Sequence, residues 1–175
     1  MENKDTLRIE KASREDLTIL LQVARKAFVQ AFTAGNKAEN VQAYLEEAFT
    51  LSQFEKEIAV TSSSFFLAKV DEKAVGYIKL NETPSQTDIH DPDSLEIARL
   101  YLLEEYLGKG YGKQLLHFAF DLARKKEKTY LWLGVWEHNT KAIRFYEKNG
   151  LRIFGSHPFP FGDELQTDYL MRIDF

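Results

Sequence analysis

The sequence predicts an α/β fold, in which helices flank a mixed, mostly antiparallel central sheet with a β-α-β unit at its centre. Residues 65–70 and 74–80 are strand-like runs joined by the tight turn Asp71-Glu72-Lys73, which predicts an antiparallel hairpin. Residues 95–136 then predict a strand, a helix and a strand, the order of a crossover unit. Residues 151–174 predict a second hairpin, which closes the sheet.

Each element follows from a local pattern. Residues 7–12 alternate apolar and polar side chains, as in a strand. Ser13 is a candidate helix N-cap, apolar residues then recur at helical spacing from Leu17 to Phe28, and Gly35 closes that helix. Residues 129–136 are nearly all apolar, which predicts a strand buried on both faces. The other expected elements are helices over 39–49, 51–60, 110–126 and 138–149, strands over 95–103, 151–159 and 166–174, and loops over 81–94 and 160–165.

Composition and charge exclude several classes of protein. The net charge of -4 argues against a nucleic-acid partner, because phosphate binding requires a basic face, and leaves room for a cationic substrate. No cysteine is present, so disulfides, thiolate zinc sites and cysteine nucleophiles are excluded. His138 and His157 lack metal-ligand spacing and are interpreted as capping and loop residues, so no metal site is expected.

The same bulk properties predict where the protein works. No stretch approaches the roughly 18 apolar residues of a membrane span. The first residues lack the apolar run of a signal peptide. We therefore expect a cytoplasmic protein with no membrane association, and one domain over residues 1–175. A homodimer stays open.

A glycine loop is the first segment that carries chemistry. Gly108, Gly110 and Gly112 follow a predicted strand and begin a helix. Glycines let the backbone approach a ligand and aim successive N–H groups at it, and the helix adds the positive end of its dipole. The loop therefore predicts a pyrophosphate site, which Lys109 and Lys113 would assist. The alternative is a glycine-rich turn that only caps the helix.

The second segment is the predicted helix over 138–149. Asn139, Ala142, Ile143 and Tyr146 recur at spacings of one and two turns, so they share one helix face. An amide and a phenol thereby lie beside small and branched apolar side chains. The alternative is an amphipathic helix with a buried, hydrogen-bonded tyrosine.

Together the two segments resemble the GNAT superfamily of N-acetyltransferases. Leu107 to Gly112 is similar to the family's cofactor loop, and the run Asn139, Ala142, Tyr146 and Gly150 matches the family's later helix throughout. The resemblance is greatest to bacterial spermidine/spermine acetyltransferases, which share the strand end Trp132–Glu137 and the hairpin Gly162–Asp168.

The resemblance implies acetyl-coenzyme A as co-substrate and a primary amine, such as a polyamine, as acceptor. In the family the strand before the loop pairs with the pantetheine arm, the loop amides hold the pyrophosphate, and the asparagine contacts the arm. The tyrosine protonates the departing thiolate, which makes Tyr146 the implied catalytic residue. The implied cofactor-binding residues are Leu100, Tyr101, Leu102, Gly108, Lys109, Gly110, Tyr111, Gly112, Lys113, Asn139 and Tyr146.

Two departures from the family pattern concern affinity and the general base. Leu107 replaces the usual Gln or Arg, so we expect weaker cofactor binding at most. Gly134 stands where many members carry a catalytic Glu. Glu96 on the preceding strand is a candidate replacement, and its alternative is a solvated strand residue.

The acceptor is the least determined part of the prediction. Carboxylates and aromatic faces suit the ammonium groups of a polyamine. The candidates are Asp163, Glu164, Asp168, Trp136 and Phe161, although Asp163 and Glu164 can equally form a solvated hairpin tip. A protein or peptide acetyltransferase, and a sensor that binds acetyl-coenzyme A without turnover, remain the alternatives.

Overall fold

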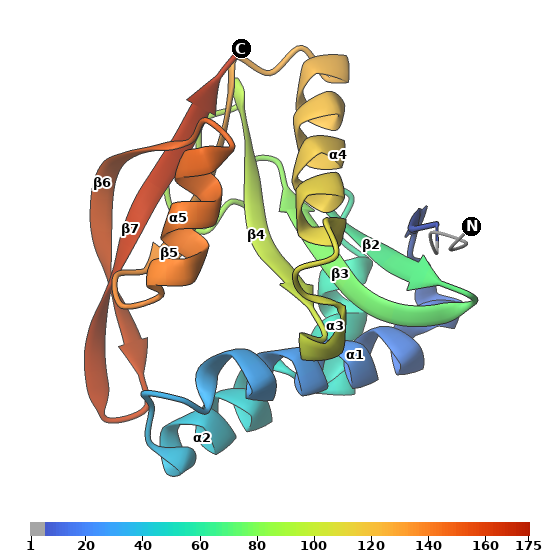
Figure 1. Cartoon of the computed structure of the whole chain (residues 1–175), viewed down its shortest axis with the longest axis vertical. Coiled ribbons are helices and arrows are strands. Elements are labelled where there is room, and N and C mark those ends of the chain that lie inside the picture. Colours follow the sequence, from blue (N-terminus) through green and yellow to red (C-terminus); the bar gives the residue numbers. More distant parts are fainter. Residues whose placement is uncertain (1–5) are drawn as a thin grey trace.

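A single seven-stranded sheet organises the chain, in the order β1-β2-β3-β4-β5-β7-β6. The computed structural model describes residues 6–175 (Figure 1). The strands are β1 (Arg8–Lys11), β2 (Ser63–Val70), β3 (Lys73–Asn81), β4 (Ser94–Leu102), β5 (Tyr130–Trp136), β6 (Arg152–Phe161) and β7 (Glu164–Asp174). The helices are α1 (Leu17–Phe32), α2 (Ala38–Ala48), α3 (Leu51–Ile58), α4 (Tyr111–Lys125) and α5 (Thr140–Lys148), with short 3-10 turns at Arg14–Asp16 and Glu104–Tyr106.

The predicted α/β class and mixed sheet are confirmed. Within residues 6–175, β4 and β5 pair in parallel, through the α4 crossover, and the other neighbouring strands pair antiparallel. The expected loop over 160–165 is wrong, because β6 and β7 pair as far as Phe161 and Glu164. Gly162, at φ +60, lets the chain reverse there in a tight turn. The β6–β7 hairpin is therefore a long two-stranded ribbon with a tight turn at its tip.

The central parallel pair is short. Its last paired residues are Ile97 and Leu133, although β4 continues to Leu102 and β5 to Trp136. Beyond that point the two strands separate, which leaves backbone donors and acceptors of β4 without a β5 partner. Gly134, the first β5 residue after the last pair, is exposed in the middle of the sheet. The sheet thus has an opening at its centre.

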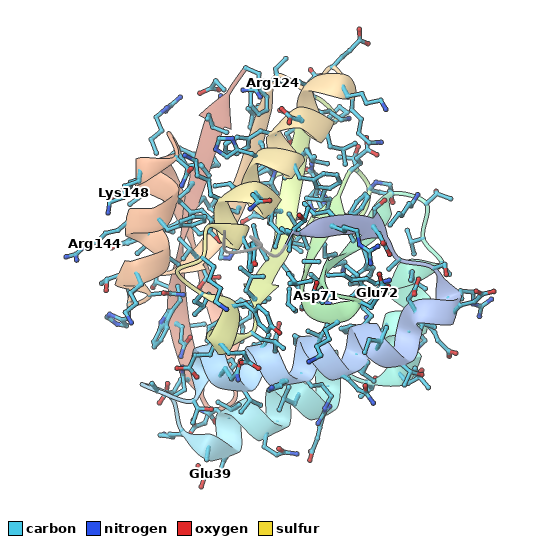
Figure 2. All side chains as sticks on the ribbon, turned by 45° about the vertical axis from the view of Figure 1, so that its right-hand side comes forward. Glu39, Asp71, Glu72, Arg124, Arg144 and Lys148 are labelled. Atoms are coloured by element: carbon cyan, nitrogen blue, oxygen red, sulfur yellow. The ribbon has the colours of Figure 1, made fainter. Side chains whose placement is uncertain are left out.

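Two apolar cores lie on opposite faces of the sheet. One contains Leu115, Leu116 and Ala119 of α4 with Leu131 and Leu133 of β5. The other holds α1, α2 and α3 against β2 and β3, and its buried members include Leu20, Phe28, Leu45, Phe54, Phe65 and Tyr77. The labelled charged side chains, Glu39, Asp71, Glu72, Arg124, Arg144 and Lys148, all point outward (Figure 2). Within residues 6–175, no helix combines the length and apolarity needed to cross a bilayer.

Gly76 fixes how closely β3 approaches β4. It pairs with Leu102, and a Cβ added to it would lie 2.4 Å from the Tyr101 carbonyl oxygen and 2.6 Å from Leu102 Cδ2. We expect Gly76→Ala to lower the free energy of unfolding by about 2 kcal/mol, because backbone has to move. Urea denaturation measures this loss. Gly155→Ala is the matched control, since its Cβ would meet Leu170 at an ordinary 3.6 Å, and equal stability losses would contradict the prediction.

Candidate active site

The glycine loop lies open at the start of α4. Gly108 and Gly110 have φ values of +74 and +84, a conformation that other residues adopt at a cost, and Gly110 is the N-cap of the helix. No heavy atom lies within 4 Å of the Cβ position at either glycine. The first amides of a helix have no intrahelical acceptor. The loop therefore offers N–H groups and the positive helix end to an anion in open space.

The structure brings the two sequence segments together at Gly112. A Cβ at this position would lie 3.6 Å from Phe145 Cζ on α5 and 3.7 Å from Leu102 Cδ1 on β4. The end of β4, the glycine loop and α5 thus meet at one point. Leu100 and Tyr101 lie half-buried on the same unpaired stretch of β4. A long ligand held at the loop can follow this strand edge into the sheet opening.

Tyr146 faces the core from α5 and is 9% exposed. Burial raises the pKa of its phenol to about 12. Burial also raises the pKa of Tyr101 well above its usual value, with smaller contributions from Tyr77, Tyr44 and Tyr146. Both phenols are therefore protonated at neutral pH.

Some of the remaining predicted cofactor residues have exposed side chains, and others have side chains that are buried or hydrogen-bonded within the protein. Lys109 is exposed and lies over the Tyr106 ring at 5.1 Å, and Lys113 is also exposed. The Tyr111 side chain is buried in the core, so this residue offers the loop its backbone. The Asn139 side-chain oxygen accepts from the Ala142 N–H at 3.2 Å and caps α5. Asn139 therefore precedes the helix that was expected to contain it.

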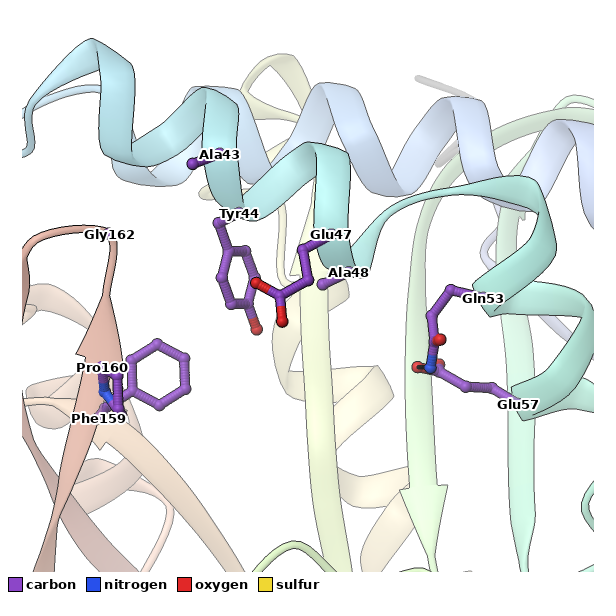
Figure 3. Close-up of a pocket in the computed structure, with 9 residues that line it drawn as sticks. All are labelled: Ala43, Tyr44, Glu47, Ala48, Gln53, Glu57, Phe159, Pro160 and Gly162. Atoms are coloured by element: carbon purple, nitrogen blue, oxygen red, sulfur yellow. Dashed lines mark hydrogen bonds between the residues drawn. The ribbon is translucent and has the colours of Figure 1, made fainter.

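A groove of about 490 Å³ opens on the other face of the sheet, between α2, α3 and the β6–β7 hairpin. Tyr44 and Phe159 point into the space from opposite walls (Figure 3). Glu47 and Glu57 add carboxylates from α2 and α3 (Figure 3). An aromatic and acidic groove of this kind suits an amine.

A buried ionic cluster supports the groove wall. Glu57 accepts from Lys79 Nζ at 2.9 Å and from both Arg99 terminal nitrogens at 2.9 and 3.3 Å. Burial favours a higher pKa for Glu57, but Arg99 and Lys79 outweigh it, and the pKa is lowered. Burial, followed by the charge of Arg99, lowers the pKa of Lys79. No sequence pattern indicated this cluster, because its members are at least twenty residues apart along the chain.

The predicted acceptor residues have different surroundings. Asp163 and Glu164 share a single partner, Lys37, at 3.1 and 3.6 Å, which balances one of their two charges. Phe161 is 2% exposed and belongs to the core, so its ring presents no free face to a cation. Trp136 is half-buried and lies 3.4 Å from the Cβ position at Gly35, in the chain between α1 and α2. Tyr44 and Phe159 take the aromatic positions in the groove instead.

Glu96 is a buried residue, so the interpretation as a solvated strand residue is wrong. It is 2% exposed, and burial raises its pKa. One carboxylate oxygen accepts from the Thr87 N–H at 2.9 Å and from Asn81 at 3.3 Å, and the other accepts from the Thr87 hydroxyl. The segment between β3 and β4 thus covers this carboxylate.

Comparison with known proteins identifies the family of this chain. The sequence model of the acetyltransferase (GNAT) family matches residues 23–151, which include both chemical segments. The chain belongs to this family. It is an acetyl-coenzyme A-dependent N-acetyltransferase, and the suspected resemblance is confirmed.

Individual relatives agree over nearly the whole chain. An uncharacterized N-acetyltransferase of Lactobacillus delbrueckii subsp. lactis is 39% identical over 166 residues, 95% of this chain and 96% of that protein. The spermidine N(1)-acetyltransferase of Thermoplasma acidophilum is 29% identical, over 85% of this chain and 89% of that protein. The crystal structure of the PaiA N-acetyltransferase from the same organism, in complex with coenzyme A, matches with a TM-score of 0.80 at 26% identity, over 97% of this chain and 99% of that one.

The residues present fit acetyl-coenzyme A. The open glycine loop can take the pyrophosphate, and the unpaired stretch of β4 runs from that loop towards exposed Gly134. When bound, the co-substrate supplies a thioester that is activated for acyl transfer. Leu107 projects from the loop with 58% of its surface exposed, so it leaves the backbone amides accessible.

Proposed function

We propose that the acceptor is a polyamine such as spermidine or spermine, acetylated by direct transfer from acetyl-coenzyme A. The observation that carries this proposal is the groove on the face opposite α4, with Tyr44 and Phe159 as aromatic walls and Glu47 as an exposed carboxylate. Ammonium groups on flexible apolar links bind such walls through ion pairs and cation–π contacts. The net charge of -4 attracts the same substrates. The relative named as a spermidine acetyltransferase supports this choice.

We assign the cofactor side to the residues that line the loop and the strand edge. The amides of Gly108 to Lys113 hold the pyrophosphate, and the β4 backbone at Leu100 to Leu102 pairs with the pantetheine arm. Asn139 contacts this arm through its amide nitrogen, since its oxygen caps α5. Tyr146 stays protonated at neutral pH, because its pKa is raised to about 12, and it donates a proton to the leaving sulfur.

A thiol-release assay over a panel of amines tests the acceptor. We expect turnover with spermidine and spermine, and at least tenfold lower kcat/KM with a peptide bearing a free amino terminus, which lacks the second ammonium group. Turnover of the peptide without turnover of either polyamine would assign the protein to peptide acetylation. Binding of acetyl-coenzyme A with no turnover across the whole panel would support a sensor.

A further inference from the structure

A carboxylate from the neighbouring strand borders the sheet opening. Asp168 Oδ2 lies 3.6 Å from the Cβ position of Gly134, the exposed residue at which β4 and β5 have separated. Asp168 belongs to β7 and pairs with Trp136 of β5. A side chain at position 134 would therefore occupy the space beside this carboxylate. Asp168 reaches across the strands to the place where the family resemblance expects a glutamate.

His157 holds this carboxylate. It stands directly opposite Asp168 in the β6–β7 ladder, and its Nε2 lies 3.5 Å from Asp168 Oδ2. Its other nitrogen, Nδ1, donates to Asp88 Oδ2 at 2.7 Å, since an ionised carboxylate can only accept. The ring is thus fixed between two carboxylates from the β3–β4 segment and β7. His157 lies in a strand, so its interpretation as a loop residue is wrong.

Asp168 lies at the opening, on the sheet face that carries the acceptor groove. Its side chain is 15% exposed, and burial raises its pKa against the opposing effect of His157. Asp168 lies opposite His157, and His157 and Phe159 are two residues apart on β6, so Asp168 shares a sheet face with Phe159, which lines the groove. Among the residues that the structure describes, His157 from β6 lies beside Asp168, and Asp88 lies at the other nitrogen of the same ring.

Two other largely buried carboxylates, Glu57 and Glu96, already have partners of their own. Glu57 is bound by Lys79 and Arg99, so a proton would have to displace two cations. Both oxygens of Glu96 accept hydrogen bonds from Thr87, which covers them. Asp168 differs from both, because its one ion-pair partner among the described residues is His157 at 3.5 Å, with no lysine or arginine beside it.

We propose that the Asp168 carboxylate takes the proton from the substrate amine and that His157 is its positioning residue. This proposal rests on the amine-acetyltransferase function. The ammonium group gives one proton to the Asp168 carboxylate, which becomes a carboxylic acid. The neutral amine nitrogen then forms a bond to the thioester carbonyl carbon, and the carbon–sulfur bond breaks. The sulfur takes a proton from Tyr146. The nitrogen loses its second proton to solvent, and solvent reprotonates Tyr146. Asp168 then releases its proton to solvent on the side of His157.

Steady-state kinetics of Asp168→Asn at two pH values test this proposal. We expect kcat/KM to fall about 10²-fold at pH 7, the lower range for a lost general base. The deficit should shrink at least tenfold at pH 9.5, because the variant depends on free amine, whose fraction rises about tenfold per pH unit below an amine pKa of about 10.4. His157→Gln should show a smaller deficit, about tenfold at pH 7, with the same narrowing at pH 9.5.

Asp174→Asn is the matched control on the same strand, since its exposed carboxylate pairs with Arg152 and Arg172. Coenzyme A binding, measured by thermal shift, should be equal in all variants and shows that they fold. If Asp168→Asn loses the same factor in kcat/KM at both pH values, or loses nothing, the proposal is overturned. It is also overturned if Glu96→Gln shows the pH-dependent loss and Asp168→Asn does not. The assay uses whichever amine the wild type acetylates, so failure of the polyamine assignment shows in the wild type and failure of this inference only in the variants.

Discussion

Tyr146→Phe is expected to lower kcat about 10²-fold or more, with the KM for acetyl-coenzyme A unchanged within about twofold. The phenylalanine ring retains the apolar contacts that Tyr146 makes in the core, so binding and folding persist. The lost hydroxyl is the group that we propose as proton donor to the leaving sulfur. Because burial raises its pKa to about 12, the wild-type hydroxyl stays protonated from pH 7 to pH 10, and no fall in rate over this window should arise from its ionisation.

Stopped-flow single-turnover measurements provide the decisive readout, since they separate acyl transfer from product release. Tyr130→Phe is a suitable control, because its hydroxyl donates to Asp91 at the far end of β5. If Tyr146→Phe acetylates at the rate of this control, the tyrosine is a core residue and another group protonates the sulfur.

Glu57→Gln should lower the free energy of unfolding by about 3 kcal/mol or more at pH 7. The substitution leaves Lys79 and Arg99 buried without their shared anion, and both side chains are almost inaccessible to water. Because the pKa of Glu57 is lowered in the folded protein, its contribution is complete above the ordinary carboxyl value of 4.5 and is lost as the pH falls through the folded value. The difference between wild type and variant should therefore shrink in acid.

Urea denaturation at pH 7 and at pH 3 measures both parts of this prediction. Glu55→Gln on the same helix is the control, since Glu55 is exposed and a surface change of this kind costs within about 0.5 kcal/mol. A loss below about 1 kcal/mol for Glu57→Gln would show that water replaces the carboxylate in the cluster.

Local chemistry made the glycine loop and the helix that carries Tyr146 predictable. The glycines at 108 and 110 adopt the left-handed conformations that glycine permits, and Asn139 caps the helix that carries Tyr146. These features depend on neighbours a few residues away, so the sequence displays them directly. The strand and helix order followed from the same short-range periodicity. The loop over 160–165 was predicted too long, because the β6–β7 ladder continues through Pro160 to Phe161.

The acceptor side depended on contacts between distant segments. Asp163 and Glu164 were predicted as ammonium ligands, and the fold places Lys37 beside both of them, 126 residues away from Asp163. Glu96 was plausible as a solvated residue until Thr87 covered it. Burial and pairing decide whether a carboxylate is free, and neither property belongs to the residue itself.

The sequence by itself determined the family, the order of strands and helices, and the glycine loop with its helix start, because each is written in residues that are close along the chain. Only the tertiary structure decided that Gly134 lies at an opening, that Asp168 borders it from another strand, and that His157 fixes that carboxylate against Asp88. The physical reason is that strand register sets cross-strand neighbours, and register is fixed by the packing of the whole sheet.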